Sequence, residues 1–170
     1  MAPGAAPLVV DAIFEERYWY PDEGGVVWLA GYQPVDPADG SYLSRDDPEL
    51  AGRGLRVAAV AGAARFHAEA LGSEQAAPGR PLELRRDRDN PHDPNAVAVH
   101  LAGTGAEQVG FVPRELAVEL APELDEGTEW SALCLREQRR SPREPRTGLT
   151  MLLGRSAKIE LREVSRARPR

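Results

Sequence analysis

The side chains best suited to bind a ligand fall in three short stretches of the chain. Arg65, Phe66 and His67 are consecutive, His92 lies in a loop rich in Asn, Asp and Pro, and Arg114 follows a proline. Flat rings such as those of Phe66, His67 and His92 can stack on nucleic-acid bases. Arginine presents a fork of donors that matches the oxygens of a phosphate group. Side chains of these types can bind a nucleic acid where the fold brings them together, and we assign no catalytic residue.

The sequence lacks the residues that several other kinds of chemistry need. The chain has no G-x-x-x-x-G-K-[ST] sequence, and Lys158 is its only lysine, so we expect no ATPase. The single cysteine, Cys134, and the three histidines are too scattered for the paired ligands of a zinc site. Cys134 also lies in an alternating apolar run, which indicates a small core residue. We therefore expect no metal and no cofactor.

Charge is divided unevenly along the chain. The formal net charge is −6, which argues against a protein that attracts nucleic acid through its overall charge. Residues 1–135 contain 10 arginines and 23 acidic residues, a balance of −13, whereas residues 136–170 contain 11 basic and 4 acidic residues, a balance of +7. This asymmetry favours an anionic partner near the basic end. Five arginines either attract phosphate groups there or belong to a solvated loop: Arg136, Arg139, Arg140, Arg143 and Arg146.

The apolar pattern predicts the elements that position these residues. Strands are predicted over 55–61, 82–86, 96–101, 108–112, 130–135, 149–153 and 159–164. Pro113 can open a helix that reaches Leu120. Two aromatic stretches, 18–20 and 26–29, flank a turn of Pro, Asp and Gly, as in a hairpin. The expected fold is mostly β with one or two short helices: a small OB-like or SH3-like β-barrel with an elaborated N-terminal segment and C-terminal strands.

Three motifs stand in a fixed order between about Leu55 and Leu124. They are VAGAARFH at 60–67, NPHDPNA at 90–96 between two predicted strands, and VGFVPRELA at 109–117. In order and spacing they resemble the HIRAN domain family, in which the N-P-x-D-x-N-A core is distinctive. The resemblance implies a barrel domain over 54–165, preceded by residues 1–53 of unknown role and followed by a basic tail at 166–170.

The resemblance also implies a ligand and a set of binding residues. HIRAN domains are small barrels similar to OB-folds, and in helicase-like fork-remodelling ATPases they capture the free 3′ end of single-stranded DNA. Asn90 and Asp93 match loop residues that line the end pocket, and Arg114 matches a residue that contacts phosphate. The Asp93 carboxylate could accept a hydrogen bond from a 3′-hydroxyl and would repel a 3′-phosphate. The expected nucleic-acid-binding residues are Arg65, Phe66, His67, Asn90, His92, Asp93 and Arg114.

Alternative interpretations stay open. The loop at 90–95 can also be a turn whose Asn and Asp side chains hold its own backbone. The negative net charge, and histidines at 67 and 92 where the family often has larger aromatics, favour a scaffold domain that binds a protein partner on the same barrel without DNA. A metal-dependent nuclease would use Asp89 and Asp93. With no run of apolar residues long enough for a membrane helix, no basic signal region and one cysteine, we expect a cytoplasmic protein without a membrane segment.

Overall fold

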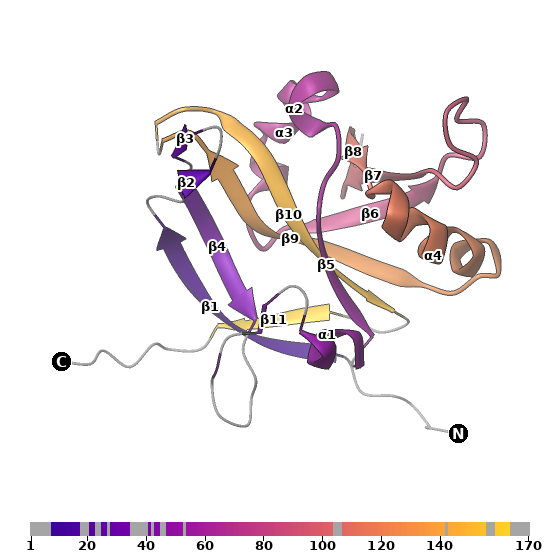
Figure 1. Cartoon of the computed structure of the whole chain (residues 1–170), viewed down its shortest axis with the longest axis horizontal. Helices are drawn as coiled ribbons and strands as arrows, with labels where there is room; N and C mark the ends of the chain where they lie inside the picture. The colour runs from indigo at the N-terminus through magenta and orange to yellow at the C-terminus, as the bar shows by residue number, and fades with distance from the viewer. Residues whose placement is uncertain are drawn as a thin grey trace.

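A computed structural model gives the fold. It describes residues 8–17, 21–22, 25–26, 28–34, 41, 43–44, 47–52, 54–103, 107–141, 143–155 and 159–163. Most of the strands belong to one curled sheet (Figure 1).

The N-terminal strands form a long hairpin. β1 (Leu8–Arg17) pairs antiparallel with β4 (Trp28–Pro34), and the short strands β2 (Pro21–Asp22) and β3 (Gly25–Val26) pair between them. A hairpin therefore forms where the two aromatic stretches predict one, although residues 18–20 lie outside the described part of the chain.

The barrel strands follow the hydrophobic pattern closely. They are β5 (Leu55–Ala59), β6 (Pro81–Arg86), β7 (Val97–Leu101), β8 (Gln108–Phe111), β9 (Trp130–Arg139) and β10 (Arg146–Arg155). Their antiparallel order is β5–β10–β9–β6–β7–β8. β9 and β10 extend beyond the predicted strands into the arginine-rich region, because the two strands pair as far as Arg139 and Arg146.

β9 connects the hairpin with the barrel. β10 lies along one side of β9, whereas β4 and β6 share its other side, β4 at residues 136–139 and β6 at Ala132 and Leu133. β11 (Ile159–Glu163) pairs with β1 and is parallel to it. The N-terminal strands thus continue the same sheet, on the opposite side of β9 and β10 from β7 and β8 in Figure 1.

The curl of the sheet brings its two edges together at one point. Ala61, just after β5, exchanges two backbone hydrogen bonds with Phe111 at the end of β8, at 2.8 and 2.9 Å. Gly110 permits this approach, because a Cβ there would lie 2.5 Å from Val60 Cγ1 and 2.6 Å from Ala61 O. The glycine therefore has the close-packing role that its position in a strand indicates.

Short helices cover the barrel. They are α1 (Pro48–Gly52), α2 (Ala63–Phe66), α3 (Ala68–Leu71), a 3₁₀ turn η1 (Glu74–Ala76) and α4 (Arg114–Asp125). α4 begins one residue later than predicted, with Pro113 as its N-cap, and continues past Pro122. The described helices are more numerous than predicted, but the mostly β fold class is confirmed, because strands form the sheet and its core.

The main core fills the barrel beneath these helices. Its buried side chains come from β7, β8, β9, β10 and the inner faces of α3 and α4, and include Leu71, Val97, Val109, Leu120 and Met151. A second cluster joins α1 and β5 to β9 and β10 through Leu50, Leu55, Leu135 and Leu152. In the part of the chain that is described, none of the helices has the length and apolar character needed to cross a membrane.

Candidate nucleic-acid interface

α2 presents an exposed aromatic side chain beside an arginine. Gly62 takes a left-handed conformation, with φ of 76°, and its carbonyl accepts the Phe66 amide at 3.1 Å. This turn directs Phe66 outward: 69% of its surface is exposed, and Val118 is the other large hydrophobic residue found exposed among the described side chains. The Arg65 guanidinium lies 5.2 Å from the centre of the Phe66 ring. Phe66 is therefore a surface ring and not a core residue.

His67 joins α2 to α3. It ends α2 through its amide, which donates to Ala63 O at 2.8 Å, and its carbonyl accepts the Leu71 amide at 2.9 Å. Its side chain is half-buried. Of the three consecutive residues, Arg65 and Phe66 are exposed, and His67 serves mainly as the connection between the helices.

Asn90 holds the β6–β7 loop in shape. Its Oδ1 accepts the amides of His92, at 2.8 Å, and Asp93, at 3.1 Å, while its Nδ2 donates to Asp87. Asp93 Oδ1 accepts the Asn95 amide at 2.9 Å. The explanation of the motif as a self-supporting turn is thus correct for Asn90 and for one oxygen of Asp93, and it leaves the exposed His92 ring free of these bonds.

Arg114 brings three of the predicted residues together. From the first turn of α4, its Nη2 donates to His92 O at 2.9 Å, and its Nε lies 3.6 Å from Asp93 Oδ2. Its side chain is 68% exposed, whereas that of Asp93 is 16% exposed. A solvent-facing guanidinium therefore lies next to a partly buried carboxylate at the tip of the loop.

Two further arginines, Arg86 and Arg88, form hydrogen bonds around the loop, and neither is among the predicted binding residues. Arg86 donates to Ala96 O at 2.7 Å and Pro94 O at 3.1 Å, and also to Asp125 at the end of α4. Arg88 donates to the same carboxylate at 2.7 Å. Hydrogen bonds from Arg86 and then Arg88 hold the pKa of Asp125 below its ordinary value of 3.8. Since Arg86 and Asp125 are far apart in the chain, only the fold reveals the pairing.

β8 links the two groups of candidate residues. Phe111 bonds to Ala61, next to α2, and the following Val112 amide donates to Val97 O at the end of the loop. In Figure 1, α2 and the loop between β6 and β7 both project beyond the same edge of the molecule, with β8 between them in the view. Arg65 and Phe66 thus form one group, and His92, Asp93 and Arg114 form another.

Three of the arginines between residues 136 and 146 form internal contacts. Arg136 donates to Tyr32 O, Arg139 donates to Glu137, and Arg146 donates to Glu137 and to two main-chain carbonyls. These three arginines lie on the paired strands β9 and β10 and not in a solvated loop. Arg140 and Arg143 are exposed.

Cys134 and the acidic side chains complete the description of the site chemistry. Cys134 is fully buried, as its sequence context predicts, and burial raises the pKa of its thiol to about 12. Among the described residues, no three His, Cys, Asp or Glu side chains gather so that they could hold a metal ion. In the described part of the chain, Asp89 and Asp93 therefore do not belong to a metal-binding group of the kind that the nuclease hypothesis needs.

Comparison with known proteins defines the family. The model of the HIRAN domain family matches residues 56–152, which is more than half of the chain. The chain belongs to the HIRAN domain family. Over 48 residues it is 50% identical to a Fanconi-associated nuclease 1 homolog of Oryza sativa subsp. japonica, a match that covers 28% of this chain and 5% of that relative. The HIRAN domain of human HLTF, in a crystal structure, aligns with a TM-score of 0.42 and 23% identity over 59% of this chain and 76% of that one.

Proposed function

We propose that this protein binds single-stranded DNA without catalysis, with a base stacked on Phe66 and the 3′ end at Asp93 and Arg114. The observation that carries the proposal is the exposed Phe66 ring with the Arg65 guanidinium over it. A buried aromatic side chain would have served the core, whereas an exposed one next to a cation offers a stacking surface and a phosphate donor together. Membership of the HIRAN family supports a nucleic-acid ligand.

The geometry at the loop tip supports recognition of a strand end. Asp93 Oδ1 accepts the Asn95 amide, whereas the polar contact found for Oδ2 among the described residues is the Arg114 guanidinium, at 3.6 Å. That separation is longer than a direct hydrogen bond, so Oδ2 can accept one from a terminal hydroxyl. Arg114 is exposed enough to bind the adjacent phosphate at the same time. A phosphate in place of the hydroxyl would meet the Asp93 charge.

The test compares two otherwise identical fluorescent oligonucleotides, one ending in a 3′-hydroxyl and one in a 3′-phosphate. We expect tighter binding of the hydroxyl end by anisotropy, and loss of that preference in Asp93→Asn, which removes the charge. Affinity should fall as salt rises, because phosphate contacts release counterions. Equal affinity for both ends, unchanged by Asp93→Asn, would refute end recognition, and the absence of binding at low salt would refute the whole proposal.

A matched pair of variants tests the stacking ring. Phe66→Ala should weaken binding by about 1–3 kcal/mol, the range for one stacked base. Val118→Ala removes the other exposed large hydrophobic side chain, which lies on α4, and should leave the affinity unchanged. If both variants bind like the unmodified protein, Phe66 is not a stacking surface.

A second candidate is a scaffold that binds a protein partner on the same barrel. The observation that favours it is the internal use of Arg136, Arg139 and Arg146, which leaves the acidic chain with fewer cations for phosphate. Recovery of a defined protein partner that Phe66→Ala abolishes, together with no oligonucleotide binding at low salt, would establish this alternative over the first.

A further inference from the structure

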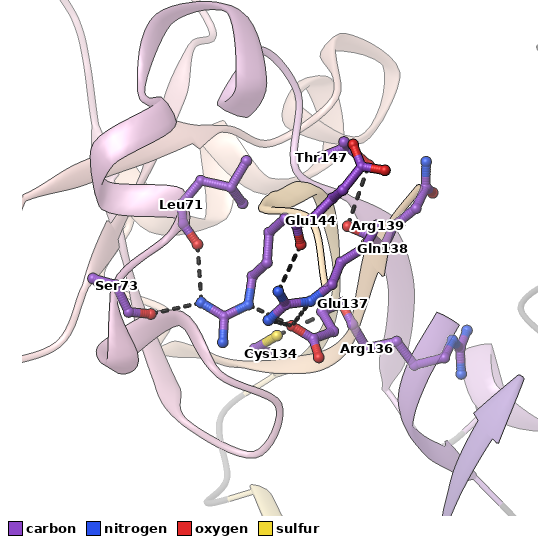
Figure 2. Close-up of polar contacts among 10 residues, drawn as sticks. Leu71, Ser73, Cys134, Arg136, Glu137, Gln138, Arg139, Glu144 and Thr147 are labelled. Atoms are coloured by element: carbon purple, nitrogen blue, oxygen red, sulfur yellow. Dashed lines mark hydrogen bonds and ion pairs between the residues drawn. The ribbon is translucent and has the colours of Figure 1, made fainter. Parts of the chain in front are cut away.

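A buried ion cluster lies beneath the helices that carry the proposed stacking surface. Glu137, on β9, is 8% exposed and is the buried charged residue among the described side chains. Its Oε1 accepts hydrogen bonds from Arg139 Nη2 at 3.0 Å and from Arg146 Nε at 2.5 Å (Figure 2). We call Glu137, Arg139 and Arg146 the Glu137 cluster. Removing charges from water is costly, so such a pair adds little net stability by itself.

The informative contacts are those on the other side of Arg146. Its Nη1 donates to Leu71 O at 3.1 Å and to Ser73 O at 2.6 Å, and its side chain is only 8% exposed. Figure 2 shows the Leu71 and Ser73 carbonyls turned toward the cluster from a segment far away in the sequence. Leu71 is the last residue of α3, where helix carbonyls lack partners within the helix. Arg146 therefore fastens the end of α3 to β10.

α2 and α3 (residues 63–71) lie against β8 and β10 of the barrel. Their buried side chains are Ala63, Ala70 and Leu71, so most of their apolar anchoring comes from one leucine. The Ser73 hydroxyl is buried without a hydrogen-bond partner, so this side chain adds no tether of its own. At the other end, the Ala61–Phe111 bonds fix the start of α2. Hydrogen bonds thus fix both ends of the segment, those of Ala61 before α2 and those from Arg146 after α3, and a small apolar contact lies between them.

We infer that Arg146, oriented by Glu137, is a positioning residue that holds α2 and α3 so that Arg65 and Phe66 face the ligand. This inference rests on the proposed DNA-binding function. The hydrogen bonds from Arg146 to Leu71 and Ser73 fix the end of α3, and the Leu71 amide bonds to His67, directly after Phe66. The guanidinium fork serves both the carboxylate and the carbonyls. A lysine ammonium in its place could not serve all three acceptors with the same geometry.

The experiment compares Arg146→Lys with Arg155→Lys in the full chain. Arg155 is a matched control, because it lies on the same strand and also pairs with a glutamate, Glu123 on α4, while its ring contact is with Trp130. Hydrogen exchange of the free protein and oligonucleotide affinity are measured for each variant. We expect Arg146→Lys to speed exchange in residues 63–73 about tenfold and to weaken binding by a similar factor, with β7 and β9 still protected. Arg155→Lys should change neither.

The two readouts separate this inference from the function on which it rests. Unchanged exchange in residues 63–73 of folded Arg146→Lys refutes the positioning role. If the unmodified protein binds no oligonucleotide while exchange in Arg146→Lys is faster, the positioning role of Arg146 is supported and the proposed DNA-binding function is refuted. Should Arg146→Lys not fold, Glu137→Gln replaces it, because the amide keeps the shape of the cluster and loosens its hold on Arg146. Slow exchange in that variant would then count against the inference.

Discussion

Replacing Gly110 by alanine perturbs the Ala61–Phe111 bridge at which the barrel edges meet. The added Cβ would lie 2.5 Å from Val60 Cγ1 and 2.6 Å from Ala61 O, both closer than a carbon atom normally approaches. The Val60 side chain could rotate away, but Ala61 O belongs to the backbone and accepts the Phe111 amide at 2.9 Å. The clash can therefore be relieved only by moving the backbone of one edge.

The magnitude follows from these contacts. Overpacking of a well-packed site destabilises the folded state by about 1–3 kcal/mol. Replacing a strand glycine by alanine stabilises it by about 0.5–1 kcal/mol, because the unfolded chain becomes less flexible. Because one of the two clashes is with the Ala61 backbone, we expect Gly110→Ala to lower the free energy of unfolding by about 1–2 kcal/mol. Gly62, the N-cap of α2, directly follows Ala61, so the shift should also weaken oligonucleotide binding.

Urea unfolding monitored by tryptophan fluorescence measures the change. Gly148→Ala is the matched control, because Gly148 also lies in a strand but a Cβ there would have its nearest neighbour, Gln138 Cβ, at 3.9 Å. We expect the control to be neutral or stabilised by up to about 1 kcal/mol. Equal stability of the two variants would show that the Ala61–Phe111 closure is not as tight as the structure indicates.

Three other changes test separate parts of the structure. Because Arg86 and Arg88 lower the pKa of Asp125 below 3.8, its carboxylate stabilises the fold above the unfolded-state pKa, and this contribution disappears as the pH falls through the folded-state pKa. Asp125→Asn should therefore destabilise the protein more at about pH 7 than at about pH 2, and a pH-independent difference in urea unfolding would contradict the ion pairing. Cys134 is buried with its pKa raised to about 12, so iodoacetamide should label it slowly in the folded protein and rapidly in urea; fast labelling of the folded protein would show that β9 opens readily. Phe66→Ala should change the free energy of unfolding by less than about 0.5 kcal/mol, since the ring is 69% exposed, and a larger loss would mean that the ring supports the fold.

The sequence predicts the strands well because their information is local. The alternation at 82–86, the turn residues at 90–95 and the apolar run at 96–101 each specify their own element, and β6 and β7 form close to the expected positions. Each of the three motifs also consists of residues that are close together in the chain, so the sequence alone indicates the family.

The partners of charged side chains could not be predicted in this way. The sequence does not distinguish an exposed arginine from a buried one. The side chain of Arg146 is largely buried because it contacts Glu137 and the end of α3, whereas Arg143 is exposed. Whether Phe66 is buried or exposed likewise depends on the left-handed turn at Gly62 and on where α2 meets the barrel. These outcomes depend on contacts between distant segments, for which one sequence has no local signal.

The sharing of β9 between β4 and β6 has a consequence for synthesis of the chain. Arg136 on β9 bonds to Tyr32 on β4, a separation of 104 positions. At a translation rate of about 5–20 residues per second, the N-terminal hairpin is made roughly 5–20 s before the strand that covers its edge. During that interval the unpaired edge of β4 can pair with another nascent chain on the same messenger RNA. Slowing translation between residues 34 and 136 should therefore increase aggregation, because it lengthens the time for which this edge has no partner.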